Sequence, residues 1–139
     1  MDSRTVELSV SADKDMMLVI RMTAAGALSR AGLTIDDIED MKLAVDEACL
    51  SLMAQPVRYE RLSATFSLAP SGVRLRVAGL SPREGDAARQ NPAEDDEVLR
   101  CVLEAMADEA VIHRDERGIF AIELARKGVA GGNGGTDAR

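Results

Sequence analysis

The segment from Thr34 to Met53 constrains the fold of this chain more than any other stretch. Its apolar side chains recur at helical spacing, so it is predicted to form a long amphipathic helix with one buried face. Thr34 and Asp37 have the spacing of a capping box at its start, and Pro56 requires the helix to have ended. The predicted inward-facing residues are Ile38, Met41, Val45, Ala48 and Leu52.

The other face of this helix is polar and carries Asp40, Glu47 and Ser51. Glu47 and Ser51 are four residues apart, which places them one above the other on the same side of the helix. A carboxylate and a hydroxyl in this arrangement are the candidate functional groups of the segment.

The flanking sequence alternates between strand and helix patterns. Apolar residues alternate with polar ones in segments 5–11, 62–68, 73–77, 110–113 and 119–125, which predicts five strands. Turn residues at 69–72 and 115–118 predict two hairpins, and segments 13–31 and 97–107 are predicted helices. The expected fold is α+β: a two-layer α/β sandwich with three helices on one face of a mixed, mostly antiparallel sheet.

Three finer expectations follow from the same patterns. Residues 79–97 are expected to form an exposed loop, because they contain two prolines and an acidic run. The helix after this loop is expected to turn Val98, Val102, Ala105 and Met106 inward. The Gly-rich segment 128–139 is expected to be a disordered tail that follows one domain of residues 1–127.

Composition and charge exclude several classes of function. The 139-residue chain has a formal net charge of −7, which argues against sequence-independent binding to DNA or RNA, because that needs a basic face. No apolar run approaches the ~20 residues of a membrane span, and the N-terminus lacks a basic-then-apolar signal. We therefore expect a cytoplasmic protein that binds neither nucleic acid nor membrane.

The residues that most often bind metals are sparse. Cys49 and Cys101 lie in predicted helices among apolar neighbours, so both are expected to be buried structural thiols. His113 has no second histidine or cysteine nearby and is expected to be a surface residue at a strand end. No metal site is predicted.

The run Asp40-Met41-Lys42-Leu43-Ala44-Val45-Asp46-Glu47-Ala48-Cys49-Leu50-Ser51 resembles a known motif. It is similar to the N-box helix of bacterial anti-sigma factors that double as serine-protein kinases, which belong to the GHKL ATPase superfamily. That helix reads roughly D-I-x-L-A-V-x-E-A-x-x-N, and the resemblance extends over about residues 5–126. It implies the GHKL (histidine-kinase-like ATPase) fold, with Glu47 at the general-base position and Ser51 at the position of the magnesium-binding asparagine. It also implies that Arg21 lies on a surface that binds the sigma factor and a second subunit; a solvated flank residue is the alternative.

The groups that such a kinase uses to hold nucleotide are missing from this sequence. Serine replaces asparagine at position 51, and Ala78-Gly79-Leu80-Ser81-Pro82 offers no carboxylate for adenine after its strand. Asp86 has no glycine pair behind it, and the region 85–97 combines one glycine with concentrated negative charge that would repel phosphate. No cofactor is therefore expected.

The resemblance implies an anti-sigma factor-like binding module that sequesters an RNA polymerase sigma factor. Release would come through a competing anti-anti-sigma protein of the STAS type, and a homodimer is expected. One alternative is an active serine kinase that uses ATP and magnesium, with Glu47 activating the substrate hydroxyl and Ser51 helping to hold the metal. Another is a small-ligand sensor that uses the vestigial pocket.

Overall fold

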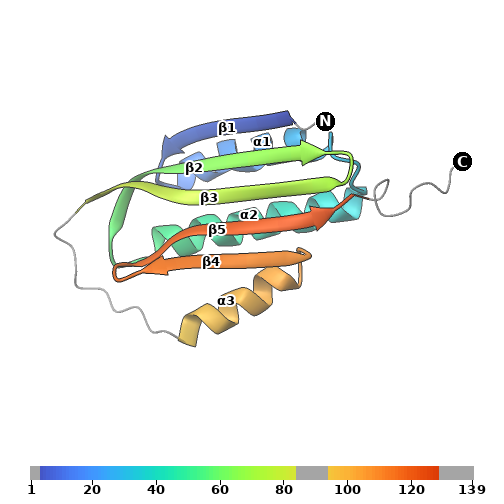
Figure 1. The fold of residues 1–139 in the computed structure, drawn as a ribbon. Helices are drawn as coiled ribbons and strands as arrows, with labels where there is room; N and C mark the ends of the chain where they lie inside the picture. Colours follow the sequence, from blue (N-terminus) through green and yellow to red (C-terminus); the bar gives the residue numbers. More distant parts are fainter. Residues whose placement is uncertain (1–3, 84–93, 129–139) are drawn as a thin grey trace, which may run out of the picture.

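The computed structural model describes residues 4–83 and 94–128. Figure 1 shows a five-stranded sheet backed by helices. In chain order the elements are β1 (Arg4–Ser11), the 3-10 turn η1 (Lys14–Met16), α1 (Met17–Leu28), α2 (Ile35–Met53), β2 (Arg58–Ala69), β3 (Gly72–Arg83), α3 (Glu94–Glu104), β4 (Glu109–Asp115) and β5 (Gly118–Lys127).

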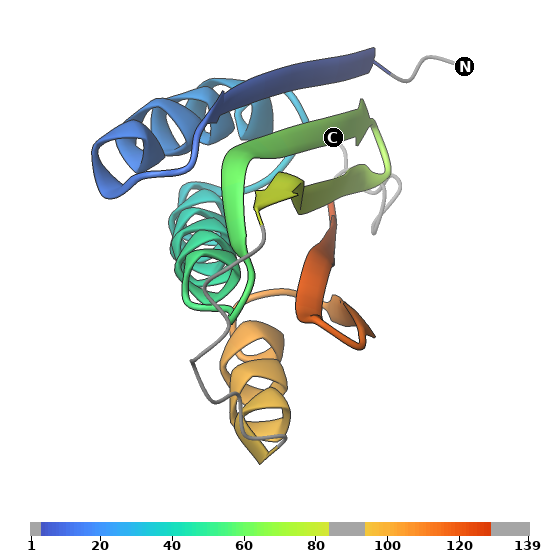
Figure 2. The ribbon, with the colours of Figure 1, turned by 90° about the vertical axis from the view of Figure 1, so that its left-hand side faces the viewer.

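The strands form one sheet in the order β1-β2-β3-β5-β4. Helices α1 and α2 cover one face of this sheet, and α3 lies beside α2 at the β4 edge (Figure 2). The predicted α+β sandwich is confirmed, and its layout is consistent with a GHKL-like fold. The predicted sheet was mixed, whereas every pairing among the described strands is antiparallel.

Helix α2 begins and packs as its sequence predicts. Thr34 caps it, and its Oγ1 accepts a hydrogen bond from the Asp37 amide at 3.0 Å. The second half of the expected capping box differs, because the Asp37 carboxylate accepts from Arg126 Nη2 of β5 at 2.6 Å instead. The buried residues of α2 are Met41, Ala44, Val45, Ala48, Cys49 and Leu52.

The core between helices and sheet is aliphatic, as expected for a chain with few aromatic residues. Ile20 and Leu28 of α1 are fully buried there, and they pack in the same cluster as Phe66 of β2 and Ile122 of β5. Because α1 and α2 both bury side chains in this single core, the sheet fixes the position of α2 and of the groups along its flank.

The predicted inward face of α3 is wrong for Val98, Val102 and Ala105, whereas Met106, just after the helix, is partly buried against the core. Leu99 and Leu103 are buried, whereas Val98 is 64% exposed and Val102 is 38% exposed. Two apolar stripes overlap on this helix, and its place at the sheet edge selects the other one. The same rotation leaves Cys101 exposed, so the prediction of two buried thiols holds only for Cys49.

The predicted loop at 79–97 begins later than expected, because β3 continues to Arg83, which pairs with Arg58 of β2. Ser81 within this extension has a φ of 56°. Asp86 and most of the expected loop lie outside the described residues, as does the predicted tail from residue 129 on. Gly128 is buried and donates its N–H to the Ser71 carbonyl at 2.9 Å.

Candidate functional site

Glu47 and Ser51 lie one turn apart on the flank of α2 and are both half-buried. Glu47 makes no hydrogen bond or ion pair with another residue of the described chain. Asp40, two turns before Glu47, lies with one carboxylate oxygen 4.0 Å from Nη1 of Arg126. The polar row Asp40–Glu47–Ser51 of α2 therefore has a paired carboxylate at Asp40 and, at Glu47, one without a partner among the described residues.

Arg21 does not project freely from α1. Its Nε lies 3.1 Å and 3.0 Å from the two carboxylate oxygens of Asp46 on α2, and its Nη2 lies 3.0 Å from one of them. The Arg21 side chain is 39% exposed. This forked ion pair ties the two helices together and leaves part of the guanidinium on the surface, where a partner can still reach it.

The described residues do not fit the magnesium and adenine groups of a GHKL kinase. They contain no group of three or more His, Cys, Asp or Glu side chains arranged to hold a metal ion. The run 78–82, where the resemblance requires a carboxylate for adenine, has none and belongs to β3. The chain remains paired to β2 up to Arg83, so the first residues of the expected loop, 79–83, are strand.

Sequence reasoning missed a buried polar cluster at the end of α2. Gln55, 6% exposed, donates from Nε2 to the Ser51 carbonyl at 2.8 Å, and its Oε1 accepts from the Ile119 amide at 2.8 Å. Tyr59 of β2, 8% exposed, donates its hydroxyl to the Ile119 carbonyl at 3.0 Å. Ile119 is the second residue of β5, so these two side chains join the end of α2 and the start of β2 to β5.

The Tyr59 ring also lies directly against Gly79 of β3. A Cβ at Gly79 would lie 2.4 Å from two ring carbons, closer than any real contact, so only glycine fits beneath this ring. The signal for this corner in the sequence is faint. Gln55 continues the row Glu47–Ser51 at the same four-residue spacing, but it stands just before Pro56 and suggests only a helix end.

The two thiols and the histidine take no part in this corner. Burial, with a smaller contribution from the Asp46 charge, raises the pKa of Cys49 to about 12, so the thiol stays protonated. His113 lies within β4, and its Nε2 is 3.2 Å from Glu123 Oε2, which also pairs with Arg76 at 3.1 Å. Cys49 and His113 are therefore structural groups in this geometry.

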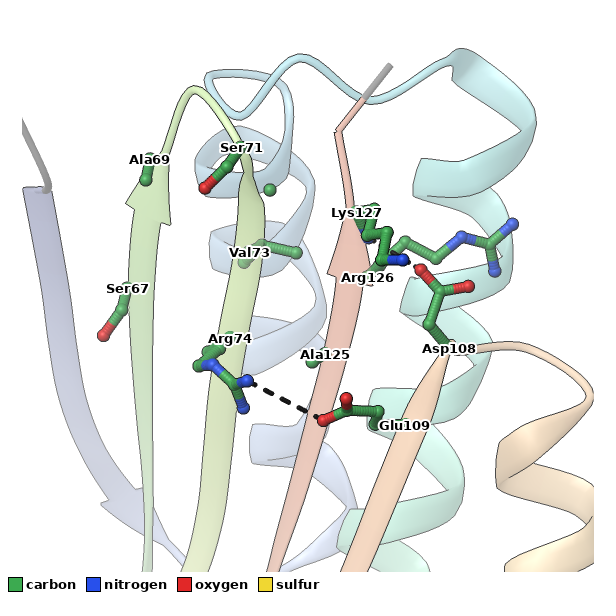
Figure 3. A pocket seen from close by; sticks show the side chains of 11 residues that line it. Ser67, Ala69, Ser71, Val73, Arg74, Asp108, Glu109, Ala125, Arg126 and Lys127 are labelled. Atoms are coloured by element: carbon green, nitrogen blue, oxygen red, sulfur yellow. Dashed lines mark hydrogen bonds and ion pairs between the residues drawn. The ribbon is translucent and has the colours of Figure 1, made fainter. Parts of the chain in front are cut away.

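A hollow of about 300 Å³ lies elsewhere, on the face of the sheet that the helices leave open. Figure 3 shows Arg74 of β3 and Glu109 of β4 pointing toward one another there, with their charged groups 3.7 Å apart. These two side chains are 70% and 61% exposed. The hollow includes neither Glu47 nor Ser51, so it is separate from the row that the sequence indicates.

The helix layer also carries exposed apolar side chains on its outer surface. Leu18 and Met22 of α1 are 54% and 63% exposed, and Leu43 and Leu50 of α2 are 56% and 39% exposed. They flank the Arg21–Asp46 pair in sequence on both helices, and all four are turned away from the core. We call these four residues the outer helix patch. In the described part of the chain, no helix is long and apolar enough to span a membrane.

Comparison with known proteins gives a partial match. No family model matches the chain. It is 32% identical over 75 residues to the serine-protein kinases RsbW of Bacillus thuringiensis (strain Al Hakam), Bacillus cereus (strain AH187) and Bacillus anthracis. The alignment covers 52% of this chain and 47% of each relative, so the chain spans about half the length of the curated relatives that it matches. The similarity supports a family relationship with these kinases.

Proposed function

We propose that this chain is an anti-sigma factor-like regulator that sequesters an RNA polymerase sigma factor and binds ATP weakly or not at all. An anti-anti-sigma protein of the STAS type would relieve the complex by competition. The similarity to RsbW and the resemblance of α2 to the N-box helix support the regulatory role. The same resemblance makes a cytoplasmic homodimer part of the proposal.

The observation that carries the proposal is the contrast between the two sides of the expected nucleotide site. The helix side is kept, with Glu47 half-buried on α2. The strand side is altered, because the run 78–82 has no carboxylate and β3 stays paired to β2 up to Arg83. Ser51 has a shorter side chain than the asparagine it replaces and reaches less far toward a metal. A scaffold of this kind supports binding to a protein better than phosphate transfer.

The outer helix patch is the surface that we assign to the sigma factor. Exposed apolar side chains grouped on one surface are typical of protein-binding sites. Acidic residues of α2 border the patch, among them Glu39 and the partly exposed Asp46, in a chain with net charge −7. Charge complementarity therefore favours a partner segment whose apolar side chains are flanked by lysine or arginine.

An active serine kinase is the second candidate, and the Glu47 carboxylate, which has no partner among the described residues, favours it. A carboxylate without an intramolecular partner is free to accept a proton from a substrate hydroxyl. Glu47 and Ser51 would then need a metal and a nucleotide held largely by residues outside the described part of the chain.

A thermal-shift titration with magnesium-ATP and magnesium-ADP separates the two candidates. A ligand at 100 times its dissociation constant stabilises the folded state by about 2.7 kcal/mol, which is easily measured. The proposed function predicts no saturable shift up to millimolar nucleotide. A clear shift, together with transfer of phosphate to a STAS-type protein, would establish the kinase instead.

Binding to the sigma factor is tested by co-expression with each sigma factor of the same genome, followed by gel filtration without added nucleotide. We expect a stable complex with one of them, and we expect Met22→Glu in the outer helix patch to weaken it at least tenfold. Val111→Glu is the matched control, because Val111 is 45% exposed on β4, away from the helix layer. Equal effects of the two substitutions, or no complex with any sigma factor, would contradict the proposal.

A further inference from the structure

The corner formed by Gln55, Tyr59, Ile119 and Gly79 contacts both stretches where the resemblance places nucleotide-binding groups, Ser51 and the run 78–82. Gln55 holds the Ser51 carbonyl on the α2 side, and the Tyr59 ring covers Gly79 on the β3 side. Both side chains then converge on the backbone of Ile119, one on its amide and one on its carbonyl. One buried amide and one buried ring therefore connect the end of α2 and the strands β3 and β5.

The contacts of Tyr59 have the chemistry of a bound planar ligand. Its ring lies against a glycine backbone, which allows an approach that any other residue would block. Its hydroxyl donates to a main-chain carbonyl at 3.0 Å in a buried position. Burial, and next the Asp115 charge, raise the pKa of this phenol, with Arg117 acting in the opposite sense, so the hydroxyl remains a donor throughout the neutral range.

We infer that Tyr59, backed by Gln55, is a built-in ligand: its ring and hydroxyl occupy the corner that a planar ring with a hydrogen-bond donor would enter. The inference rests on the proposed loss of nucleotide binding and adds a reason for it. An external heterocycle must displace a ring that is already buried and hydrogen-bonded.

Removing the ring should turn the corner into a real binding site. We expect Tyr59→Ala to bind p-cresol, which restores both the ring and the donor, with a saturable rise in Tm of about 4 °C at ~10-fold excess over its dissociation constant. Toluene has the same ring without the hydroxyl and should bind at least tenfold more weakly. The unsubstituted protein should respond to neither compound, because Tyr59 fills the space.

Phe66→Ala supplies a matched control. Phe66 of β2 is fully buried in the aliphatic core, so its removal also leaves a ring-sized space. That space should favour toluene over p-cresol, because a buried hydroxyl without a partner is costly. A preference for p-cresol in Tyr59→Ala alone therefore reports the Ile119 acceptor rather than a general effect of lost core volume.

Two results would overturn the inference. One is an equal response of Tyr59→Ala to both compounds, and the other is a p-cresol shift of the unsubstituted protein as large as that of the variant. If Tyr59→Ala does not fold, hydrogen exchange of the unsubstituted protein decides: the Ile119 amide should be protected like the core strands, and rapid exchange would mean that the corner opens. The proposed function is tested separately by ADP, since a shift of the unsubstituted protein with ADP contradicts it whatever p-cresol does.

Discussion

Replacing Arg126 with methionine should destabilise the fold far more than the same change at a surface arginine. Arg126 lies on β5, and its Nη2 donates to Asp37 at 2.6 Å while its Nη1 donates to the Met106 carbonyl at 2.7 Å. The arginine and aspartate side chains are only 21% and 18% exposed. This single side chain therefore joins the first turn of α2 to the connection between α3 and β4.

The size of the effect follows from these contacts. Methionine keeps most of the packing of the arginine stem, so the loss is mainly polar. Two hydrogen bonds from a charged group are lost, each worth about 1.5–3 kcal/mol, and the Asp37 carboxylate stays largely buried without its partner. The N-terminus of α2 partly compensates that charge by about 0.3–1 kcal/mol. We expect a net loss of about 2–5 kcal/mol, or about 6–15 °C in Tm.

Urea unfolding followed by circular dichroism measures this loss, and Arg76→Met is the matched control. Arg76 also sits in the sheet and pairs with Glu123 at 3.1 Å, but the two side chains are 44% and 39% exposed. Such a pair contributes at most about 1 kcal/mol. A cost of less than about 1 kcal/mol for Arg126→Met, or one equal to that of Arg76→Met, would refute the reasoning. Adding Asp37→Asn should then cost little more, since the pair is already broken.

Three further predictions concern α2 and the two thiols. Thr34→Ala should lower the free energy of unfolding by about 1 kcal/mol through loss of the cap, and a cost below about 0.3 kcal/mol in urea would contradict the capping role. A thiol reagent such as Ellman's reagent should modify the exposed Cys101 quickly and Cys49, 1% exposed, only after unfolding; two fast equivalents per chain would disagree. Burial raises the pKa of folded Cys49 from 9.0 to about 12, so its stabilising contribution is complete below pH 9 and is lost between pH 9 and 12 as the unfolded chain releases the proton. Cys49→Ala should flatten that alkaline decline in urea titrations, and an unchanged slope would count against it.

The sequence predicted α2 well, because its local signals and its tertiary environment agree. One apolar stripe, one capping threonine and one proline beyond the end all point to the same helix, and the observed helix runs from Ile35 to Met53. The strands were found for the same reason, since alternation is strict where one face of a sheet is buried. Their ends were less certain, as β3 shows by continuing to Arg83.

Helix α3 shows where local pattern stops being sufficient. Val98 and Val102 form one apolar stripe and Leu99 and Leu103 form another, and both have helical spacing. Periodicity alone cannot tell which of the two stripes is buried. The position of the helix beside β4 decides this, and it buries the leucines. An exposed Cys101 follows from the same choice.

The Gln55–Tyr59 corner could not be predicted because its partners are distant in sequence. Ile119 lies 64 residues after Gln55 and 60 residues after Tyr59. Neither residue stands out locally, and the close approach of the ring to Gly79 depends on how β2 and β3 pair. Only the tertiary structure brings these groups together.

Glu47, Ser51 and Gln55 follow one another at four-residue spacing, but the side chains at the two ends of this row differ in their hydrogen-bond partners. At its far end Gln55 is committed to two buried backbone partners, whereas Glu47 has no intramolecular partner among the described residues. A small ligand needs both ends of such a row, because its ring and its charged groups bind at the same time. A protein partner needs only the open end, where a half-buried carboxylate can pair with a lysine or arginine that arrives on a complementary surface. The geometry of α2 is for this reason easier to reconcile with recognition of a protein than with the binding of a nucleotide.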